Sequence, residues 1–197
     1  MPLEKAIVTT DGGEHGQAAD ARVRVWDPLV RIMHWGLVFS VALAWWTCNG
    51  GGVLHEWAGN TTLMIVVLRI VWGWGGPPYA RFRQFVREPA AIRHYARQLL
   101  ARKAPRYVGH NPLGGWMILL LLIDVALTGL SGWLYTTDAY WGEQWLESVH
   151  NVLAWSLLAL VTLHVAAVVG MSIHHAENLA GAMIHGRKRP GVGDDIA

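Results

Sequence analysis

The sequence has little cysteine and little charge. Cys48 is its single cysteine, which excludes a disulfide within the chain and a zinc or iron–sulfur site built on several cysteines. Charged residues make up 15% of the 197 residues, against about 25% in an average soluble domain. The first 25 residues are polar and lack the apolar run of a cleavable signal peptide. We therefore expect residues 1–22 to form a cytoplasmic arm.

Apolar residues are abundant instead, at 53% of the chain, and twelve tryptophans suit the two interfaces of a membrane. A helix that crosses a hydrocarbon core of about 30 Å needs about 20 mostly apolar residues. Four segments meet this length: Leu29–Thr47, His55–Trp74, Pro112–Tyr135 and Val149–Ser172. The sequence therefore predicts an all-α fold, an integral membrane four-helix bundle. Asp27-Pro28 and Pro112 are typical helix-start signals for the first and third of these helices.

Basic residues are distributed unequally over the connections. "CNGGGV" and "TTDAYWGEQWLES" contain no Lys or Arg, whereas residues 75–111 hold eight Lys and Arg residues against one acid, Glu88. Three more basic residues lie in the tail, at Arg187, Lys188 and Arg189. The positive-inside rule then places both termini and the segment 75–111 in the cytoplasm. This orientation is that of a multi-pass protein of a bacterial inner membrane.

Between the second and third spans, "AAIRHYARQLLARK" predicts an amphipathic helix on the inner leaflet. Its apolar face is expected to contain Ile92, Tyr95, Ala96, Leu99 and Leu100. An ordinary solvated basic connector is the alternative interpretation. The predicted domain organisation is an arm of residues 1–22, a transmembrane domain of residues 23–190 and a tail of residues 191–197.

Two histidines of the last span, His150 and His164, are fourteen residues apart. In an α-helix this interval corresponds to about 21 Å and about 40° of rotation. The two side chains therefore share one helix face but cannot bind the same metal ion, because metal–nitrogen bonds are about 2 Å long. They must belong to two sites at different depths of the membrane.

Two further histidines lie at matching depths. His55 begins the second span at the outer level of His150, and His34 lies about 20 Å deeper in the first span, near the level of His164. Paired neutral imidazoles in a bundle core suit the two axial positions of a six-coordinate haem iron, which carries electrons rather than binding oxygen. An isolated hydrogen-bonding role is the alternative for any single histidine. The other six histidines are expected to be solvated or interfacial, with His174 the alternative inner ligand: His15, His94, His110, His174, His175 and His185.

Four segments together resemble the bacterial dihaem cytochrome b561 family, in particular the cytochrome b subunits of nickel–iron hydrogenases. These are "VRVWDPLVRIMHW", "LRIVWGWGGPPYARF", "GHNPLGGWMILLLL" and "ENLAGAMIHGRKR", within residues 22–190. The resemblance implies a four-helix membrane cytochrome with two b haems that exchanges electrons with the quinone pool. It implies the same four haem ligands: His34, His55, His150 and His164.

Three other charged residues of the spans have two interpretations each. Arg31 and Arg69 could bind the propionates of the inner haem, or their guanidinium groups could reach the anionic inner leaflet. Asp124 in the third span could relay protons to quinone, but a hydrogen bond to a neighbouring helix is the favoured interpretation. Gly129 and Gly132 could permit a close approach of a helix or haem.

The predicted function is transmembrane electron transfer through two bis-histidine b haems, between a periplasmic redox protein and quinone. The periplasmic partner would be a c-type cytochrome, a hydrogenase or another dehydrogenase; a homodimer is compatible with the sequence, and nucleic acid is not expected as a partner. Two alternatives are a superoxide oxidase coupled to quinone reduction and a proton-coupled transporter. We expect quinone to react beside the inner haem, and electrons to enter at the outer one.

Overall fold

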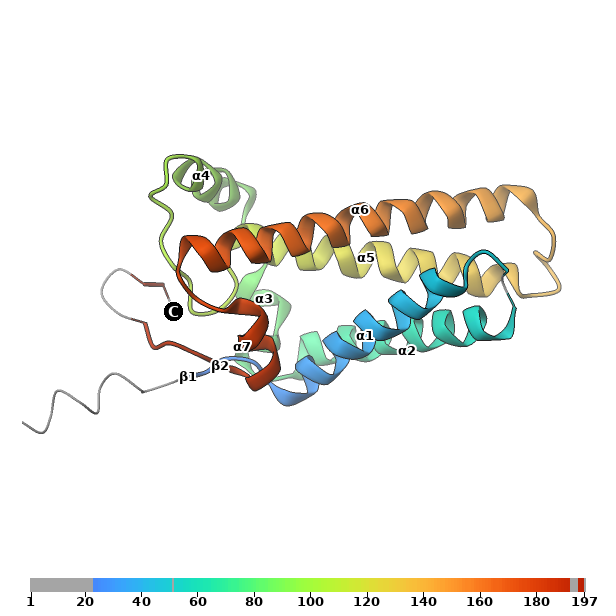
Figure 1. Ribbon diagram of the computed structural model, residues 1–197, viewed down its shortest axis with the longest axis horizontal. Coiled ribbons are helices and arrows are strands. Elements are labelled where there is room, and N and C mark those ends of the chain that lie inside the picture. The colour runs from blue at the N-terminus through green and yellow to red at the C-terminus, as the bar shows by residue number, and fades with distance from the viewer. Residues whose placement is uncertain (1–22, 51, 192–194, 197) are drawn as a thin grey trace, which may run out of the picture.

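Long helices dominate the computed structural model, which describes residues 23–50, 52–191 and 195–196. Two antiparallel helical hairpins lie along one another (Figure 1). Helices α1 (Pro28–Thr47) and α2 (Val53–Gly75) form the first, and α5 (Pro112–Tyr135) and α6 (Gln144–His174) form the second. The predicted arm of residues 1–22 lies outside the described residues.

The predicted start signals form the expected caps. The Asp27 side chain accepts hydrogen bonds from the backbone N–H groups of Leu29 and Val30, with Pro28 in the first turn of α1. Asn111 caps α5 in the same way, since its side chain accepts from the N–H of Gly114. In both helices a side chain just before the first turn therefore accepts hydrogen bonds from backbone N–H groups that have no partner within the helix.

Three helices within the described residues are long and apolar enough to cross a membrane: α1, α5 and α6. Helix α2 has a comparable length of 23 residues but contains several polar side chains. Helix α6 begins at Gln144, before the predicted Val149, because part of the supposed outer loop continues the helix. Its 31 residues are more than a span of about 30 Å requires.

The two hairpins pack through α2 and α5, with α6 behind them. Val66, Val125 and Leu157 are buried together at this junction, one from each of the three helices. Helices α1 and α6 meet where the rings of Trp45 and Trp155 lie 5.2 Å apart. Many other apolar side chains face outward, as expected for helices whose surroundings are lipid.

The basic segment between α2 and α5 contains a 3-10 turn (Pro78–Ala80) and helices α3 (Phe82–Phe85) and α4 (Pro89–Leu100). The apolar face predicted for α4 is divided in the structure. Tyr95 is buried and packs on Tyr107, with ring centroids 5.5 Å apart, whereas Leu100 is 87% exposed. Desolvation, together with the nearby Tyr107, raises the pKa of Tyr95 to about 12. The face is therefore shared between the protein and its surroundings.

After α6, the chain returns across the inner end of the hairpins. Helix α7 (Leu179–His185) leads into β2 (Arg187–Lys188), which pairs antiparallel with β1 (Val23–Arg24), the segment that precedes α1. Figure 1 places α7, β1 and β2 together at the end where α1 begins. The two ends of the described chain are thus joined at the end of the hairpins where α1 begins.

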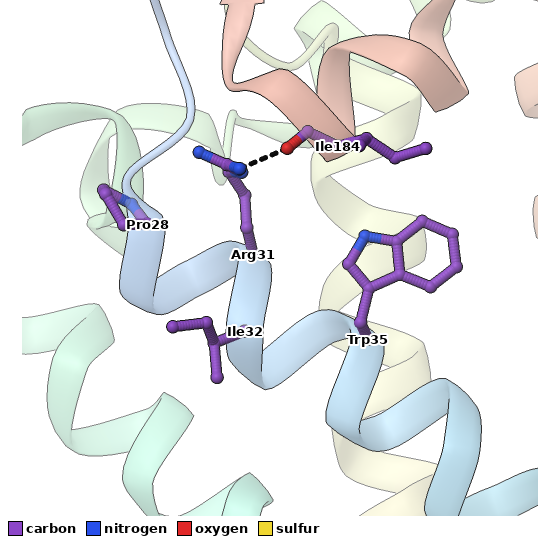
Figure 2. Close-up of a pocket in the computed structure, with 5 residues that line it drawn as sticks. All are labelled: Pro28, Arg31, Ile32, Trp35 and Ile184. Atoms are coloured by element: carbon purple, nitrogen blue, oxygen red, sulfur yellow. Dashed lines mark hydrogen bonds between the residues drawn. The ribbon is translucent and has the colours of Figure 1, made fainter.

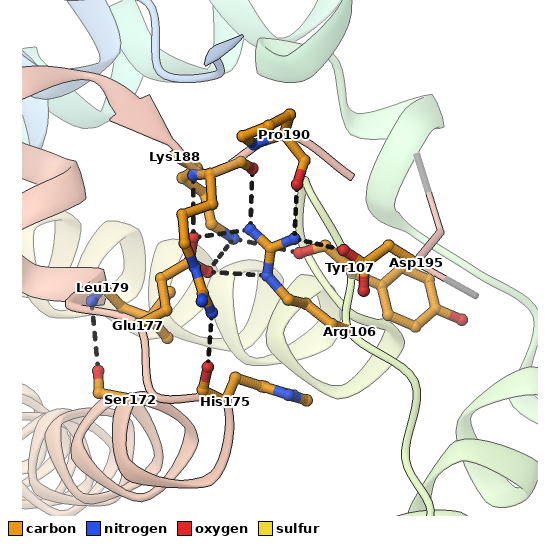
Figure 3. Close-up of polar contacts among 10 residues, drawn as sticks. Arg106, Tyr107, Ser172, His175, Glu177, Leu179, Lys188, Pro190 and Asp195 are labelled. Atoms are coloured by element: carbon orange, nitrogen blue, oxygen red, sulfur yellow. Dashed lines mark hydrogen bonds and ion pairs between the residues drawn. The ribbon is translucent and has the colours of Figure 1, made fainter. Parts of the chain in front are cut away.

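A charged cluster fixes this return segment to the loop before α5 (Figure 3). Arg106 binds Glu177 at 2.7 Å and Asp195 at 2.6 Å, and Lys188 contacts Glu177 at 3.3 Å. Burial alone would raise the pKa of Glu177, but the hydrogen bond from Arg106 and the charge of Lys188 outweigh it and lower that pKa. The cluster therefore keeps Glu177 ionised.

Residues of the predicted tail also contact the loop. The N–H of Val108 donates to the Ile196 carbonyl, and the N–H of Ile196 donates to the Arg106 carbonyl. Ile196, which the sequence analysis assigned to the tail of residues 191–197, is thus hydrogen-bonded to the loop before α5.

Candidate functional site

The outer pair of histidines comes together between α2 and α6. The rings of His55 and His150 have centroids 6.1 Å apart and an interplanar angle of 83°. Two nitrogen–metal bonds of about 2 Å, added to the distance from each ring centre to its nitrogen, give about 6 Å. The separation therefore suits one metal ion held between the two rings.

The other ring nitrogen of each histidine is bound to a backbone carbonyl. His55 Nδ1 lies 3.0 Å from the Ala44 carbonyl oxygen on α1, and His150 Nδ1 lies 3.1 Å from that of Thr128 on α5. A carbonyl oxygen can only accept, so each Nδ1 must carry the proton. Each Nε2 then holds the lone pair that a metal requires, and the carbonyl fixes the ring's orientation.

Helix α5 comes unusually close to this pair. A Cβ atom on Gly132 would lie 3.0 Å from Cε1 of His150 and 3.3 Å from its Nδ1. The hydroxyl of Ser131 is 3.1 Å from the same Nδ1 and donates to the Thr128 carbonyl. Gly132 therefore permits α5 to approach the His150 ring, as one of the two expectations for this glycine had it. Ser131 is a further neighbour of His150 that the sequence analysis did not identify.

The inner pair joins α1 and α6. His34 and His164 lie close enough for their charges to interact, and the His34 ring packs edge-on against Trp35 at 5.3 Å. Both histidines are half-buried. The structure thus brings His55 and His150 into ring contact, and it places one residue of each expected pair on α6.

Buried polar atoms gather at the inner end without partners among the described residues. They are His34 Nδ1, Arg69 Nη1 and Trp72 Nε1. Arg69 is held in place by a hydrogen bond from Nη2 to the Ala80 carbonyl at 3.1 Å, and its guanidinium lies 5.2 Å from the Phe82 ring centroid. The buried cation of Arg69 and the buried N–H donor of Trp72 suit the carboxylates of haem propionates. Trp72 was not noticed in the sequence, because a membrane tryptophan has many ordinary roles.

Arg31 lies apart from this group, on the face of α1 that is turned away from the bundle and toward α7. Its Nη2 donates to the Ile184 carbonyl of α7, across a cleft that opens to the exterior (Figure 2). The Arg31 Nε is buried and has no hydrogen-bond partner among the described residues.

His110 differs from its prediction as a solvated or interfacial residue. Its ring packs between Trp26 and Phe85, with centroid distances of 4.6 and 4.9 Å. Desolvation by burial, and then the charges of Arg69, Lys188 and His164, lower the pKa of His110 to about 3. The sequence places this residue in a basic segment, and the folding of α3 against α5 makes it half-buried between two aromatic rings.

His174, the alternative inner ligand, is at the end of α6. It packs against His175 with ring centroids 4.7 Å apart, at the surface where α6 stops.

Asp124 makes the interhelical hydrogen bond that was the favoured interpretation. Its side chain is buried and accepts from the Ser156 hydroxyl of α6 and from Thr128 of its own helix. These contacts supply partners for a carboxyl group in an apolar layer.

Each of the two expected histidine pairs provides two ligands for a metal ion. Within the described residues, no group of three or more His, Cys, Asp and Glu side chains could hold a metal ion. Two histidines facing one another suit a metal that carries its other ligands with it, as the iron of haem does with its porphyrin. The donor set, the proton positions and the buried polar atoms all fit haem.

Comparison with known proteins agrees with this chemistry. The model of the prokaryotic cytochrome b561 family matches residues 25–186. A probable Ni/Fe-hydrogenase B-type cytochrome subunit of Rhizobium leguminosarum bv. viciae is 24% identical, over 88% of this chain and 92% of that protein. Subunits of the same description from Bradyrhizobium diazoefficiens and Azotobacter vinelandii are 24% and 23% identical, and each alignment covers at least 93% of both chains. No solved structure matches the chain.

Proposed function

Because this chain belongs to the prokaryotic cytochrome b561 family, whose members transfer electrons across membranes with b-type haem, we propose that it binds two haems. They would join a periplasmic redox protein to the quinone pool of a bacterial inner membrane. The observation that carries this proposal is the His55–His150 pair, with both Nδ1 atoms tied to carbonyls and both Nε2 atoms left to bind iron.

The outer pair would hold the first haem from α2 and α6. Haem b with both axial positions filled supplies one-electron transfer at iron. The carbonyls of Ala44 and Thr128 keep the two imidazoles neutral and oriented, so little rearrangement is needed when the charge of the site changes. Lipid-facing tryptophans and the apolar helices keep water from the pair.

The inner pair, His34 and His164, would hold the second haem. Arg69 is the residue we assign to its propionates, with Trp72 as a further donor, because each has a buried N–H group without a partner among the described residues. Arg31 was an equal candidate in the sequence, but its contact with α7 supports a different role. His110 would form part of the wall, as a neutral ring between two aromatic side chains.

The orientation rests on charge. Helix α2 would be the fourth crossing, since it is as long as α1 and antiparallel to it. The basic residues beside α4 and β2 place this end in the cytoplasm by the positive-inside rule, together with both termini. Helix α4 would lie at the inner leaflet, with Leu100 toward lipid and Tyr95 toward the protein.

We assign one redox partner to each end of the helical bundle. The relatives' names support a hydrogenase as the periplasmic partner, although a c-type cytochrome or another dehydrogenase suits the same chemistry. Quinone would react at the inner end, beside His34 and His164, where basic residues and the Tyr95–Tyr107 pair lie near the leaflet. Electrons would enter at the outer pair.

Haem stoichiometry tests the proposal directly. A pyridine haemochrome assay on fully loaded protein should give two haems a chain, since one iron cannot reach both His150 and His164. His55→Ala or His150→Ala should remove one haem, and His34→Ala or His164→Ala the other. His174→Ala is the matched control and should keep both. One haem in the wild type would contradict the proposal, and two haems in His164→Ala would move the inner ligand to His174.

Two other functions are separable from this one. A superoxide oxidase would reduce quinone after pulse addition of superoxide to haem-loaded protein, whereas a relay subunit would not. A proton-coupled transporter would give no b-type signal in a reduced-minus-oxidised spectrum. The hydrogen bonds that Asp124 receives from Ser156 and Thr128 support a structural role for it rather than a relay.

A further inference from the structure

A cleft opens on the outside of the bundle where α7 crosses the first turns of α1 (Figure 2). It encloses about 370 Å³ and is lined by Pro28, Arg31, Ile32, Trp35 and Ile184. Ile32 and Ile184 are 68% and 60% exposed, so the apolar walls of the cleft face the surroundings of the bundle. At this depth those surroundings are acyl chains, if the orientation under the proposed function holds.

The cleft is built around one cation. Arg31 donates to the Ile184 carbonyl on the opposite wall, and Trp35 Nε1 donates to the Met183 carbonyl at 3.4 Å. Gly186 ends α7 with a φ of 79°, and a Cβ there would lie 2.9 Å from Nη1 of Arg31. Glycine at position 186 therefore permits both the left-handed backbone conformation that ends α7 and the close approach of the Arg31 guanidinium.

Two more arginines adjoin Arg31. Arg187 follows Gly186 directly and pairs in register with Arg24 in the β1–β2 ribbon, and both side chains are exposed. Opposite residues of an antiparallel pair project to the same side, where two like charges destabilise the ribbon unless an anion lies between them or nearby. Among the described residues, no carboxylate forms an ion pair with Arg24, Arg31 or Arg187. The nearest acid along the chain, Asp27, is engaged in capping α1.

We propose that this cleft binds an anionic phospholipid of the inner leaflet. Its phosphate pairs with Arg31, within the field of Arg24 and Arg187, and one acyl chain lies along Ile32, Trp35 and Ile184. Basic pockets beside membrane helices on the cytoplasmic side suit anionic head groups, and only a lipid also fills an apolar wall that opens to the bilayer. The inference rests on the proposed orientation but not on the haems.

Lipid retention by the full-length protein tests the proposal. Native mass spectrometry in mild detergent, with phosphatidylglycerol and phosphatidylcholine of the same acyl chains, should reveal a preference for the anionic lipid. Arg31→Gln should weaken phosphatidylglycerol binding about fivefold, the effect of one basic residue at a membrane surface. Arg31→Lys should retain most of the preference. Arg93→Gln removes an exposed arginine of α4 and is the matched control, with binding as in the wild type.

Several results would refute the proposal that the cleft binds an anionic phospholipid. They are equal retention of both lipids, equal effects of the two Gln variants, or displacement of phosphatidylglycerol by millimolar inorganic phosphate or by a peptide of residues 1–22. Haem content is measured in the same samples. Loss of the inner haem in Arg31→Gln would make Arg31 a propionate ligand instead. Wild-type protein that lacks b haem but prefers phosphatidylglycerol would refute the proposed function and leave this inference intact.

Discussion

The contact between Gly132 and His150 gives a measurable prediction for Gly132→Ala. The new methyl group would lie 3.0 Å from Cε1 of His150, whereas carbon atoms in ordinary contact are about 3.5–4.0 Å apart. The imidazole must therefore move away from α5 by roughly 0.5 Å. The bond from Nδ1 to the Thr128 carbonyl, now 3.1 Å, would lengthen to roughly 3.6 Å, beyond hydrogen-bonding distance.

The expected result is selective loss of the outer haem. Loss of a hydrogen bond that orients a metal ligand lowers metal affinity about 10- to 100-fold. Haem titration and redox difference spectra of Gly132→Ala should therefore weaken the component that His55→Ala abolishes. Two control variants separate crowding from this effect: Gly129→Ala meets Leu63 rather than a histidine, and Gly170→Ala meets nothing within 4 Å. Normal haem affinity and potentials in Gly132→Ala would refute the assignment of Thr128 as the group that orients His150.

Three further predictions concern other parts of the molecule. Glu177→Gln should destabilise the protein by about 3 kcal/mol at pH 7, because the buried Lys188 and the half-buried Arg106 lose the carboxylate that they share. Since the folded-state pKa of Glu177 is lowered, this stabilisation is present above the unfolded pKa of about 4.3 and is lost as pH falls, so the thermal midpoints of variant and wild type should converge in acid. Asp124→Asn should retain both haems and quinone reduction, while Asp124→Leu should cost only about 0.5–1.5 kcal/mol, because the Ser156 hydroxyl can still donate to the Leu153 carbonyl. A loss of steady-state quinone reduction in Asp124→Asn alone would instead indicate a proton relay. A quinone-site inhibitor should shift only the potential of the haem that His34→Ala removes, and a shift confined to the other haem would place quinone on the outer side.

Spacing along single helices was enough to predict how the histidines group. The interval between His150 and His164 depends only on helical rise, so it required two sites at two depths. The structure places the His55 ring beside His150, and the pairing of His34 with His164 stays a prediction. That these rings bind haem remains a proposal, because spacing gives position and not occupancy.

Features that depend on contacts between helices could not be predicted. The carbonyls of Ala44 and Thr128 belong to neighbouring helices, and every residue type has a carbonyl, so no sequence signal marks them. The same limit applies to His110, whose place in a basic segment suggests solvent while its neighbours in space are Trp26 and Phe85. Leu100 was assigned with Tyr95 by periodicity, but packing of α4 against the protein separates the two.

The ribbon between β1 and β2 has a consequence for biosynthesis. Val23 and Arg24 are among the first described residues to leave the ribosome, and their partners, Arg187 and Lys188, are among the last. This end of the hairpins therefore stays open until the ribbon forms, so under the proposed function haem could still reach His34 after all four long helices have been made. We expect released protein truncated before Arg187 to accept haem faster than full-length protein, and equal rates would show that the ribbon is no barrier to loading.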